Sequence, residues 1–332
     1  MAATERRVTR RGFLLALAAG TATTVLAACG GGATPMGAPA TAPTVASVTR
    51  AAPTVAATPT RQINVAATTT HIQDFLKNVG GDRLAVSGIL KPNVDPHDYE
   101  TSVQDAQAIS RAEIIFVYGV GLDAFMDKAI ANANSKAPVI TVTRGITPLA
   151  GGNKDPYGDP HMWFDPTIVQ KMVTDIGEAL AQLDPPSAAT YRQNVQGYNA
   201  QIARMDAQVQ GIYNQIPAAD RKLVTNHEAF QYLANRFGLN IVGAVIPSIS
   251  DAAEPTAQEI NELIGTIREQ KVKAIFAESS ANPRVARQAA QETGIKIVDN
   301  LYGDTLGEPG SDGDTYIKMM VADATTIATA LK

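Results

Sequence analysis

Three of the four histidines of this chain lie in polar motifs that follow predicted strands. His97 lies in PNVDPHDYE, His161 in DPHMWFDP and His227 in TNHEAF. Imidazole is the commonest side-chain ligand for zinc and its chemical neighbours. In doubly wound sheets, ligands bind in the crevice beyond the carboxyl ends of the strands, so the three side chains can face one cleft. Residue type and placement together indicate a transition-metal site.

Two of these histidines follow an Asp-Pro step, which could orient them. Proline fixes the backbone before His97 and His161 and removes a competing N–H donor. The preceding Asp95 and Asp159 can accept a hydrogen bond from the far imidazole nitrogen or cap the following turn. Spacings of 64 and 66 residues between the three histidines match no local zinc-finger pattern. The site is therefore a hypothesis about tertiary structure, and a lone histidine is more often a hydrogen-bonded structural residue.

Composition narrows the classes of function. The 332 residues are 45% hydrophobic and 18% charged, which is the balance of a soluble globular protein. A net charge of −4 argues against nucleic-acid binding, which needs a basic face. Cys29 is the only cysteine, which excludes an intramolecular disulfide and a cysteine-rich zinc site.

The amino-terminal segment predicts export and a lipid anchor. Four arginines precede an apolar run over residues 13–28, so residues 1–28 have the layout of a signal peptide. The run is short and broken compared with the roughly 20 apolar residues of a spanning helix. TRRGFL (9–14) resembles a twin-arginine signal, with the Sec route as the alternative. LAAC (26–29) resembles a lipobox, in which the sulfur of Cys29 carries a diacylglycerol.

Residues 29–61 predict a flexible tether. They are mostly Gly, Ala, Pro and Thr and cannot bury enough apolar surface to offset the entropy of an ordered chain.

A chain that starts at Cys29 loses four Arg and one Glu, which leaves 24 basic and 31 acidic residues and a net charge of −7.

The rest of the chain predicts an α/β fold with two Rossmann-like lobes, residues 62–185 and 217–332. In each lobe, strand patterns alternate with helix patterns, which indicates a parallel sheet flanked by helices. The strand patterns cover 63–70, 84–90, 113–119, 138–143, 222–226, 240–246, 273–279 and 295–300. The helix patterns cover 72–79, 102–111, 122–134, 228–237, 256–270, 283–293 and 314–331.

A single long helix over 186–216 is expected to join the lobes. Apolar or aromatic residues recur in steps of three and four, at Tyr191, Val195, Tyr198, Ile202, Met205, Val209 and Ile212. About thirty residues at 1.5 Å each give roughly 45 Å, enough to run along both lobes. Two shorter helices are the alternative, but no proline interrupts the pattern.

The three histidine motifs resemble those of the zinc- and manganese-binding solute proteins of ABC metal importers, some of which are labelled adhesins. The resemblance runs from residue 62 to residue 332 and includes FAESSANPRVARQAAQETGIKI and LYGDTLGEPGSDGDTYIKMM. It implies a fourth ligand on the Asp of a D-[ST]-[LI] step, which is Asp304 here. Spacing alone leaves Asp299, Asp312 and Asp314 open.

The resemblance therefore implies the ligands His97, His161, His227 and Asp304, two from each lobe. Relatives with Glu in place of the third histidine are associated with manganese. Three nitrogens and one carboxylate rank zinc first and manganese second. The stretch 147–158 has no histidine, unlike the His-rich loop of many zinc-specific relatives.

Several neighbouring residues have smaller expected roles. His71 is expected to line the cleft without binding the ion, because the matching family position is usually aliphatic. Glu278 is expected either to orient His227 or Asp304 or to cap a helix. Trp163 is expected to pack beside His161.

Two functions compete. The first is a monomeric, lipid-anchored binding protein that delivers its ion to an ABC permease and ATPase, with a small rotation between the lobes. The alternative is a secreted zinc-dependent hydrolase, which needs an open coordination position and a general base such as Glu228 or Glu278. The chain contains neither an HExxH pattern nor a Walker motif, and four protein ligands favour binding over catalysis. The sequence does not address adhesion.

Overall fold

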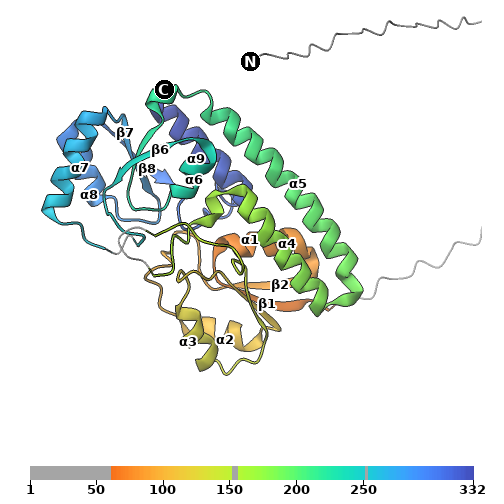
Figure 1. Cartoon of the computed structure of the whole chain (residues 1–332). Helices are drawn as coiled ribbons and strands as arrows, with labels where there is room; N and C mark the ends of the chain where they lie inside the picture. The colour runs from red at the N-terminus through yellow and green to blue at the C-terminus, as the bar shows by residue number, and fades with distance from the viewer. Residues whose placement is uncertain (1–60, 152–155, 251–252) are drawn as a thin grey trace, which may run out of the picture. The chain divides into compact units, whose positions relative to one another are not determined.

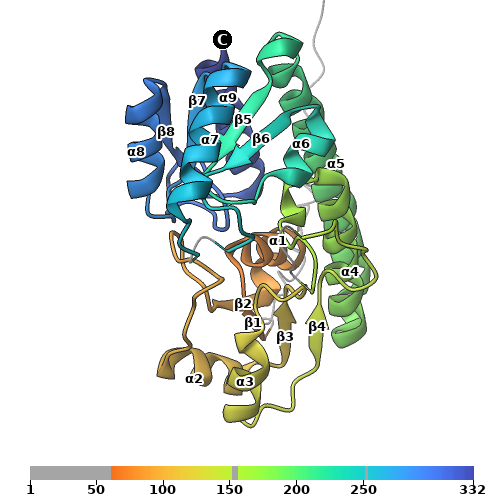
Figure 2. The ribbon, with the colours of Figure 1, turned by 60° about the vertical axis from the view of Figure 1, so that its left-hand side comes forward.

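The computed structural model describes residues 61–151, 156–250 and 253–332. Cys29, the predicted signal peptide and all but the last residue of the predicted tether lie outside the described residues. Two four-stranded parallel sheets form the centres of two lobes, which lie one above the other in Figure 2. No helix in the described ranges is both long enough and apolar enough to cross a membrane. The predicted fold class is confirmed.

The sheet of the first lobe has the order β2-β1-β3-β4, and all its strand pairs are parallel. Its strands are β1 (Ile63–Ala67), β2 (Leu84–Gly88), β3 (Ile114–Val117) and β4 (Val139–Thr141). The connecting helices are α1 (Thr70–Gly80), α2 (Val103–Arg111) and α3 (Phe125–Asn132). Helices α2 and α3 cover one face through a cluster that includes Ile109, Ile115 and Met126. Helix α1 covers the other face, where Phe75 is buried.

The second lobe repeats this arrangement with the strand order β6-β5-β7-β8. Its strands are β5 (Lys222–Thr225), β6 (Asn240–Ala244), β7 (Ala274–Glu278) and β8 (Lys296–Leu301). Its helices are α6 (Gln231–Phe237), α7 (Ala257–Gln270), α8 (Arg284–Thr293) and α9 (Tyr316–Leu331). A core cluster containing Leu263, Ile275 and Ala289 packs α7 and α8 on one face, and α9 packs on the other. The carboxyl ends of the strands in both sheets point toward the boundary between the lobes (Figures 1 and 2).

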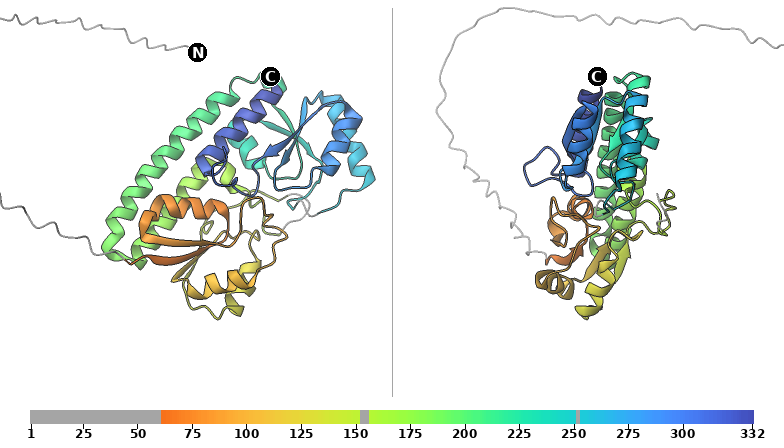
Figure 3. Two further views of the ribbon diagram at one scale, coloured as in Figure 1. Left: turned by 180° about the vertical axis from the view of Figure 1, so that it is seen from behind. Right: turned by 90° about the vertical axis from the view of Figure 1, so that its left-hand side faces the viewer.

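A long helix, α5 (Ala188–Tyr213), runs beside both lobes (Figure 3). Its 26 residues extend about 39 Å at 1.5 Å each. Its buried stripe follows the predicted positions until the last turn, where Tyr213 is buried and Ile212 is only partly buried. One continuous apolar core joins residues of both lobes along this helix. The lobes are therefore fastened to a common rigid element.

One helix of the described residues, α4 (Pro166–Leu183), is not among the helices predicted from the sequence. The carboxylate of Asp165 caps its first turn by accepting a hydrogen bond from the backbone N–H of Thr167, and Pro166 occupies the first helical turn. Val169, Met172, Val173, Ile176 and Leu180 are buried, and α4 packs along α5. This cap and this spacing are readable in the sequence.

Candidate metal centre

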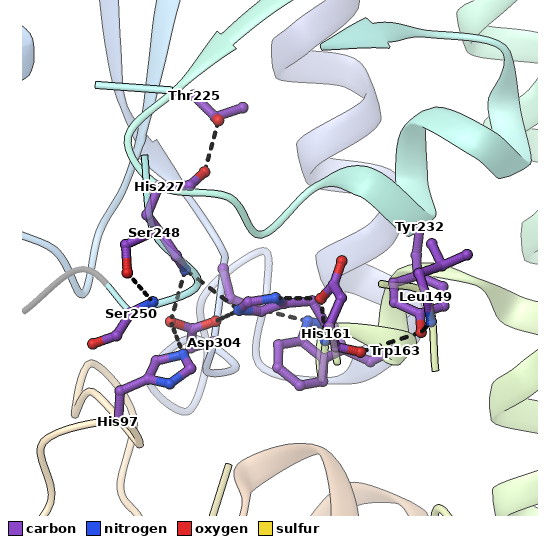
Figure 4. A network of polar contacts seen from close by, with 12 residues as sticks. His97, Leu149, His161, Trp163, Thr225, His227, Tyr232, Ser248, Ser250 and Asp304 are labelled. Carbon is purple, nitrogen blue, oxygen red and sulfur yellow. Dashed lines mark hydrogen bonds and ion pairs between the residues drawn. The ribbon is translucent and has the colours of Figure 1, made fainter. Parts of the chain in front are cut away.

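The four predicted ligands come from four separate segments that meet at the boundary between the lobes (Figure 4). His97 lies on the loop after β2, His227 follows β5 and Asp304 follows β8. His161 differs from the sequence interpretation, because β4 ends at Thr141 and His161 instead precedes the short 3-10 helix Met162–Phe164. One ligand atom from each of the four residues lies within 4.8 Å of all the others.

The carboxylate of Asp304 lies among three Nε2 atoms. Its Oδ1 is 3.2 Å from His161 Nε2, and its Oδ2 is 3.5 Å from His227 Nε2 and 3.8 Å from His97 Nε2. His161 Nε2 and His227 Nε2 are 3.4 Å apart. Bonds of 2.0–2.1 Å to a tetrahedral zinc ion would separate the ligand atoms by about 3.3 Å. The distances among His161, His227 and Asp304 are close to that value, and the distance from Asp304 to His97 is longer.

The group is buried. The side chains of His161 and His227 are 0% exposed, that of Asp304 is 2% exposed and that of His97 is 9% exposed. Four donors around one point leave no coordination position for a water molecule. Such a site can hold an ion but cannot readily activate water.

The charges of these groups perturb one another. Burial opposes ionisation of Asp304, but the nearby His227, His161 and His97 hold its pKa well below the usual range. Burial also disfavours the charged form of His161, yet hydrogen bonds to Asp159 and Asp304 raise its pKa to about 9. Burial lowers the pKa of His97, against the attraction of Asp304. Asp304 and the histidines around it therefore favour one another's charged forms, against the effect of burial.

Carboxylates lie behind two of the histidine rings, and Asp159 orients one of them by hydrogen bonds. The Nδ1 of His161 donates to Asp159 Oδ1 at 2.8 Å, and the backbone N–H of His161 donates to the same oxygen at 2.9 Å. On the other side of the site, His227 Nδ1 lies 3.3 Å from Glu278 Oε1. A proton held on Nδ1 leaves the Nε2 lone pair of a neutral ring for an ion.

Asp95 caps the turn at His97, which is the second of the two roles expected for it. Its Oδ1 accepts a hydrogen bond of 2.7 Å from the backbone N–H of His97, so it fixes the turn and not the ring. The three alternatives to Asp304 are engaged elsewhere, with Arg287 (Asp299), Tyr302 (Asp312) and Lys318 (Asp314).

Trp163 does more than pack beside His161. Its ring meets that of His161 edge-on at 5.2 Å, and its Nε1 donates to the carbonyl of Gly303 at 3.1 Å. Trp163 therefore connects a ligand of the first lobe with the residue before Asp304 in the second. The sequence held a signal for this hydrogen bond, because the N–H of a buried tryptophan normally donates to an acceptor.

His71 is fully buried and stacks on Trp163, with ring centroids 4.7 Å apart and planes inclined by 18°. Burial lowers its pKa to about 3. Neither of its ring nitrogens has a hydrogen-bond partner among the described residues. It is not one of the four residues whose ligand atoms converge.

Of the two candidate bases for hydrolysis, Glu278 has its Oε1 3.3 Å from His227 Nδ1. Glu228 is partly buried, and burial raises its pKa. It lines a neighbouring cavity of about 330 Å³ together with Asp159 and Phe230. Neither carboxylate belongs to the converging group.

Sequence comparisons match both lobes. A model of the family described as zinc-uptake complex component A, periplasmic, matches residues 65–330. The iron-binding protein YfeA of Yersinia pestis is 33% identical over 262 residues, which cover 78% of this chain and 83% of YfeA. The zinc-binding protein TroA of Treponema pallidum is 31% identical over 267 residues, with coverages of 78% and 86%. The manganese ABC transporter substrate-binding lipoprotein PsaA of Streptococcus anginosus is 30% identical over 268 residues, with coverages of 78% and 86%.

Solved structures show the same fold. The periplasmic zinc binding protein TroA from Treponema pallidum matches with a TM-score of 0.74 at 30% identity, covering 81% of this chain and 99% of TroA. A Mn-bound periplasmic metal binding protein from Candidatus Liberibacter asiaticus matches with a TM-score of 0.73 at 27% identity, with coverages of 82% and 100%. The similarity extends through both sheets and the long helix between them.

Proposed function

Because this chain belongs to the zinc-uptake complex component A family, we propose that it captures one transition-metal ion between its lobes and delivers it to an ABC importer. The observation that carries the proposal is the convergence of His97, His161, His227 and Asp304 within 4.8 Å. Two ligands come from each lobe, so separation of the lobes would dismantle the site. Capture and release then follow from closing and opening one cleft.

Zinc is the first candidate for the ion and manganese the second. The names of the relatives do not identify the ion, because YfeA is named for iron, TroA for zinc and PsaA for manganese. A set of three imidazoles and one carboxylate supports zinc, and the separations among His161, His227 and Asp304 are near those of a tetrahedron. Manganese favours oxygen-rich sets.

The protein works outside the cytoplasm, held to the membrane by a lipid on Cys29. Residues 1–28 direct export by the twin-arginine or the Sec route, and residues 29–61 tether two lobes, 62–185 and 217–332. The linking segment 186–216, which contains α5, joins the lobes. Sequence motifs support this arrangement, and PsaA is named a lipoprotein. The partners are the permease and ATPase of the importer, and the binding protein acts as a monomer.

The closed ligand set supports binding and not hydrolysis. A hydrolytic zinc site keeps a position for water beside three protein ligands. Here a fourth protein ligand, Asp304, lies among the three histidines. An esterase and peptidase screen of the zinc-loaded protein is expected to show no turnover, and turnover that disappears in His227→Ala would favour the hydrolase.

The direct test is elemental analysis of protein purified without added metal, followed by competition titration with a chelator. We expect one ion per chain and, in Asp304→Asn, an affinity loss of at least about 100-fold, since changes behind the ligands alone cost 10–100-fold. Asp299→Asn is the matched control, because Asp299 is a nearby acid paired with Arg287. Equal affinities of the two variants would refute the assignment of Asp304.

A further inference from the structure

Asn93 is the residue of the His97 loop that reaches across the lobe boundary. It lies between β2 and His97 with a positive φ of 60°, the left-handed conformation that most side chains avoid. Glycine adopts this backbone without strain, and asparagine tolerates it. A glycine would satisfy the turn, so the turn alone does not require the carboxamide.

The contacts of Asn93 all lead to the second lobe. Its backbone N–H donates to Thr305 Oγ1 at 3.0 Å, and its side-chain Oδ1 accepts a hydrogen bond of 3.3 Å from Ser279 Oγ. A third contact, from Asn93 Nδ2 to Glu308 Oε1, is long at 3.5 Å. One residue of the first lobe is thus tied to three residues of the second, and we call this set the Asn93 latch.

Two partners of Asn93 lie next to residues of the site in the sequence. Thr305 follows Asp304 directly, and Ser279 follows Glu278, whose carboxylate lies 3.3 Å from His227 Nδ1. Asn93 itself precedes His97 by four residues. His97 is also the most exposed of the four ligands. Its position therefore depends most on how its loop is held.

We propose that Asn93 is a positioning residue whose carboxamide holds the His97 loop against the second lobe and thereby sets the rate at which the bound ion leaves. This inference rests on the proposed function, because it concerns release from the same site. Ion release requires His97 to separate from Asp304, and that separation breaks the latch. The side-chain contacts of Asn93 are at the surface, where water competes for them, so each contributes modestly.

The test measures release of Zn²⁺ from the full-length protein into an excess of a colorimetric chelator. Asn93→Gly keeps the left-handed backbone and the N–H contact to Thr305 but removes the carboxamide. Two exposed hydrogen bonds predict release about fivefold faster than in the wild type. Ser279→Ala removes one of the same contacts, so it should also accelerate release. The double variant should release Zn²⁺ little faster than Asn93→Gly alone, because both substitutions remove the same hydrogen bond between Ser279 and Asn93.

Asn134→Gly is the matched control. Asn134 is also an exposed asparagine with positive φ, 49°, but it follows α3 in the first lobe. It should release Zn²⁺ at the wild-type rate. Bound Co²⁺ gives a second readout: its absorption spectrum should be unchanged in Asn93→Gly, because the four ligands remain, whereas a disordered site would alter it.

Three results overturn the latch while leaving the proposed function intact. They are release from Asn93→Gly within twofold of wild type, equal acceleration in Asn134→Gly, and an altered Co²⁺ spectrum in Asn93→Gly. A wild-type protein that holds neither Zn²⁺ nor Mn²⁺ overturns both proposals. If Asn93→Gly does not fold, Ser279→Ala decides, and release from it at the wild-type rate refutes the latch.

Discussion

Replacement of His71 by leucine should make the metal-free protein more resistant to acid. His71 is fully buried against Trp163, and burial lowers its pKa from 6.5 to about 3. The folded protein therefore keeps this imidazole neutral at pH values where the unfolded chain binds a proton. Leucine has a similar volume and no proton to bind, so His71→Leu removes the difference.

The size of the effect follows from linkage. A group whose pKa is lowered by folding leaves stability unaffected above the unfolded value and reduces it as pH falls from 6.5 toward 3. At pH 5 the penalty covers 1.5 pH units, which is about 2 kcal/mol at 1.36 kcal/mol per unit. At pH 7.5 it is close to zero. The stability of His71→Leu relative to wild type should therefore improve by about 2 kcal/mol from pH 7.5 to pH 5.

Urea unfolding followed by far-ultraviolet circular dichroism, with a chelator present, measures this difference at both pH values. The absolute stability of His71→Leu can shift in either direction through packing, but only the pH-dependent part tests the reasoning. Tyr118→Phe is the control, since Tyr118 is buried beside the same Trp163 and its pKa lies well above 10. A His71→Leu difference that is the same at both pH values would show that His71 is not held neutral by burial.

Three further predictions concern the ion. Glu278→Gln should weaken Zn²⁺ binding about 10–100-fold by chelator competition, because His227 loses the charge beside its Nδ1; an unchanged affinity would exclude this support. Zn²⁺ affinity should rise about tenfold per pH unit up to about pH 9, because His161 carries a proton that the ion must displace; calorimetry in buffers of different ionisation enthalpy measures that proton, and a flat profile contradicts it. The radius of gyration should change little on metal loading, because α5 fastens both lobes, and a wide opening seen by X-ray scattering would refute this.

The sequence predicted the sheets and the long helix well, because their signals are local. Strands such as Ile63–Ala67 and Ala274–Glu278 are largely buried and apolar, and the buried stripe of α5 repeats over about six turns. The prediction of α4 failed although the same kind of signal was present. Its first residue belongs to the motif DPHMWFDP around His161, which indicates a metal ligand and draws attention away from the start of a helix.

The convergence of the candidate ligands was harder to predict. Placing His97 and His227 after strands is a rule of the fold, but His161 comes from an irregular segment that no such rule covers. Family resemblance, and not spacing, distinguishes Asp304 from its neighbouring aspartates. The roles of Trp163 and His71 depend on side-chain packing, to which sequence periodicity is blind.

Contacts across the lobe boundary were the feature that the sequence predicted least well. These contacts affect both how tightly the ion is held and how fast it is released. Because one continuous core joins the two lobes along α5, we expect the lobes to move little, so that a small displacement must suffice to break the metal site. A site whose ligands are almost fully buried holds an ion tightly unless one ligand can leave first. His97 is the most exposed ligand, and its loop is held to the second lobe through contacts of Asn93, part of them at the surface. Release through that loop requires no rearrangement of the core, whereas movement of His161 or His227 would disturb residues packed within it.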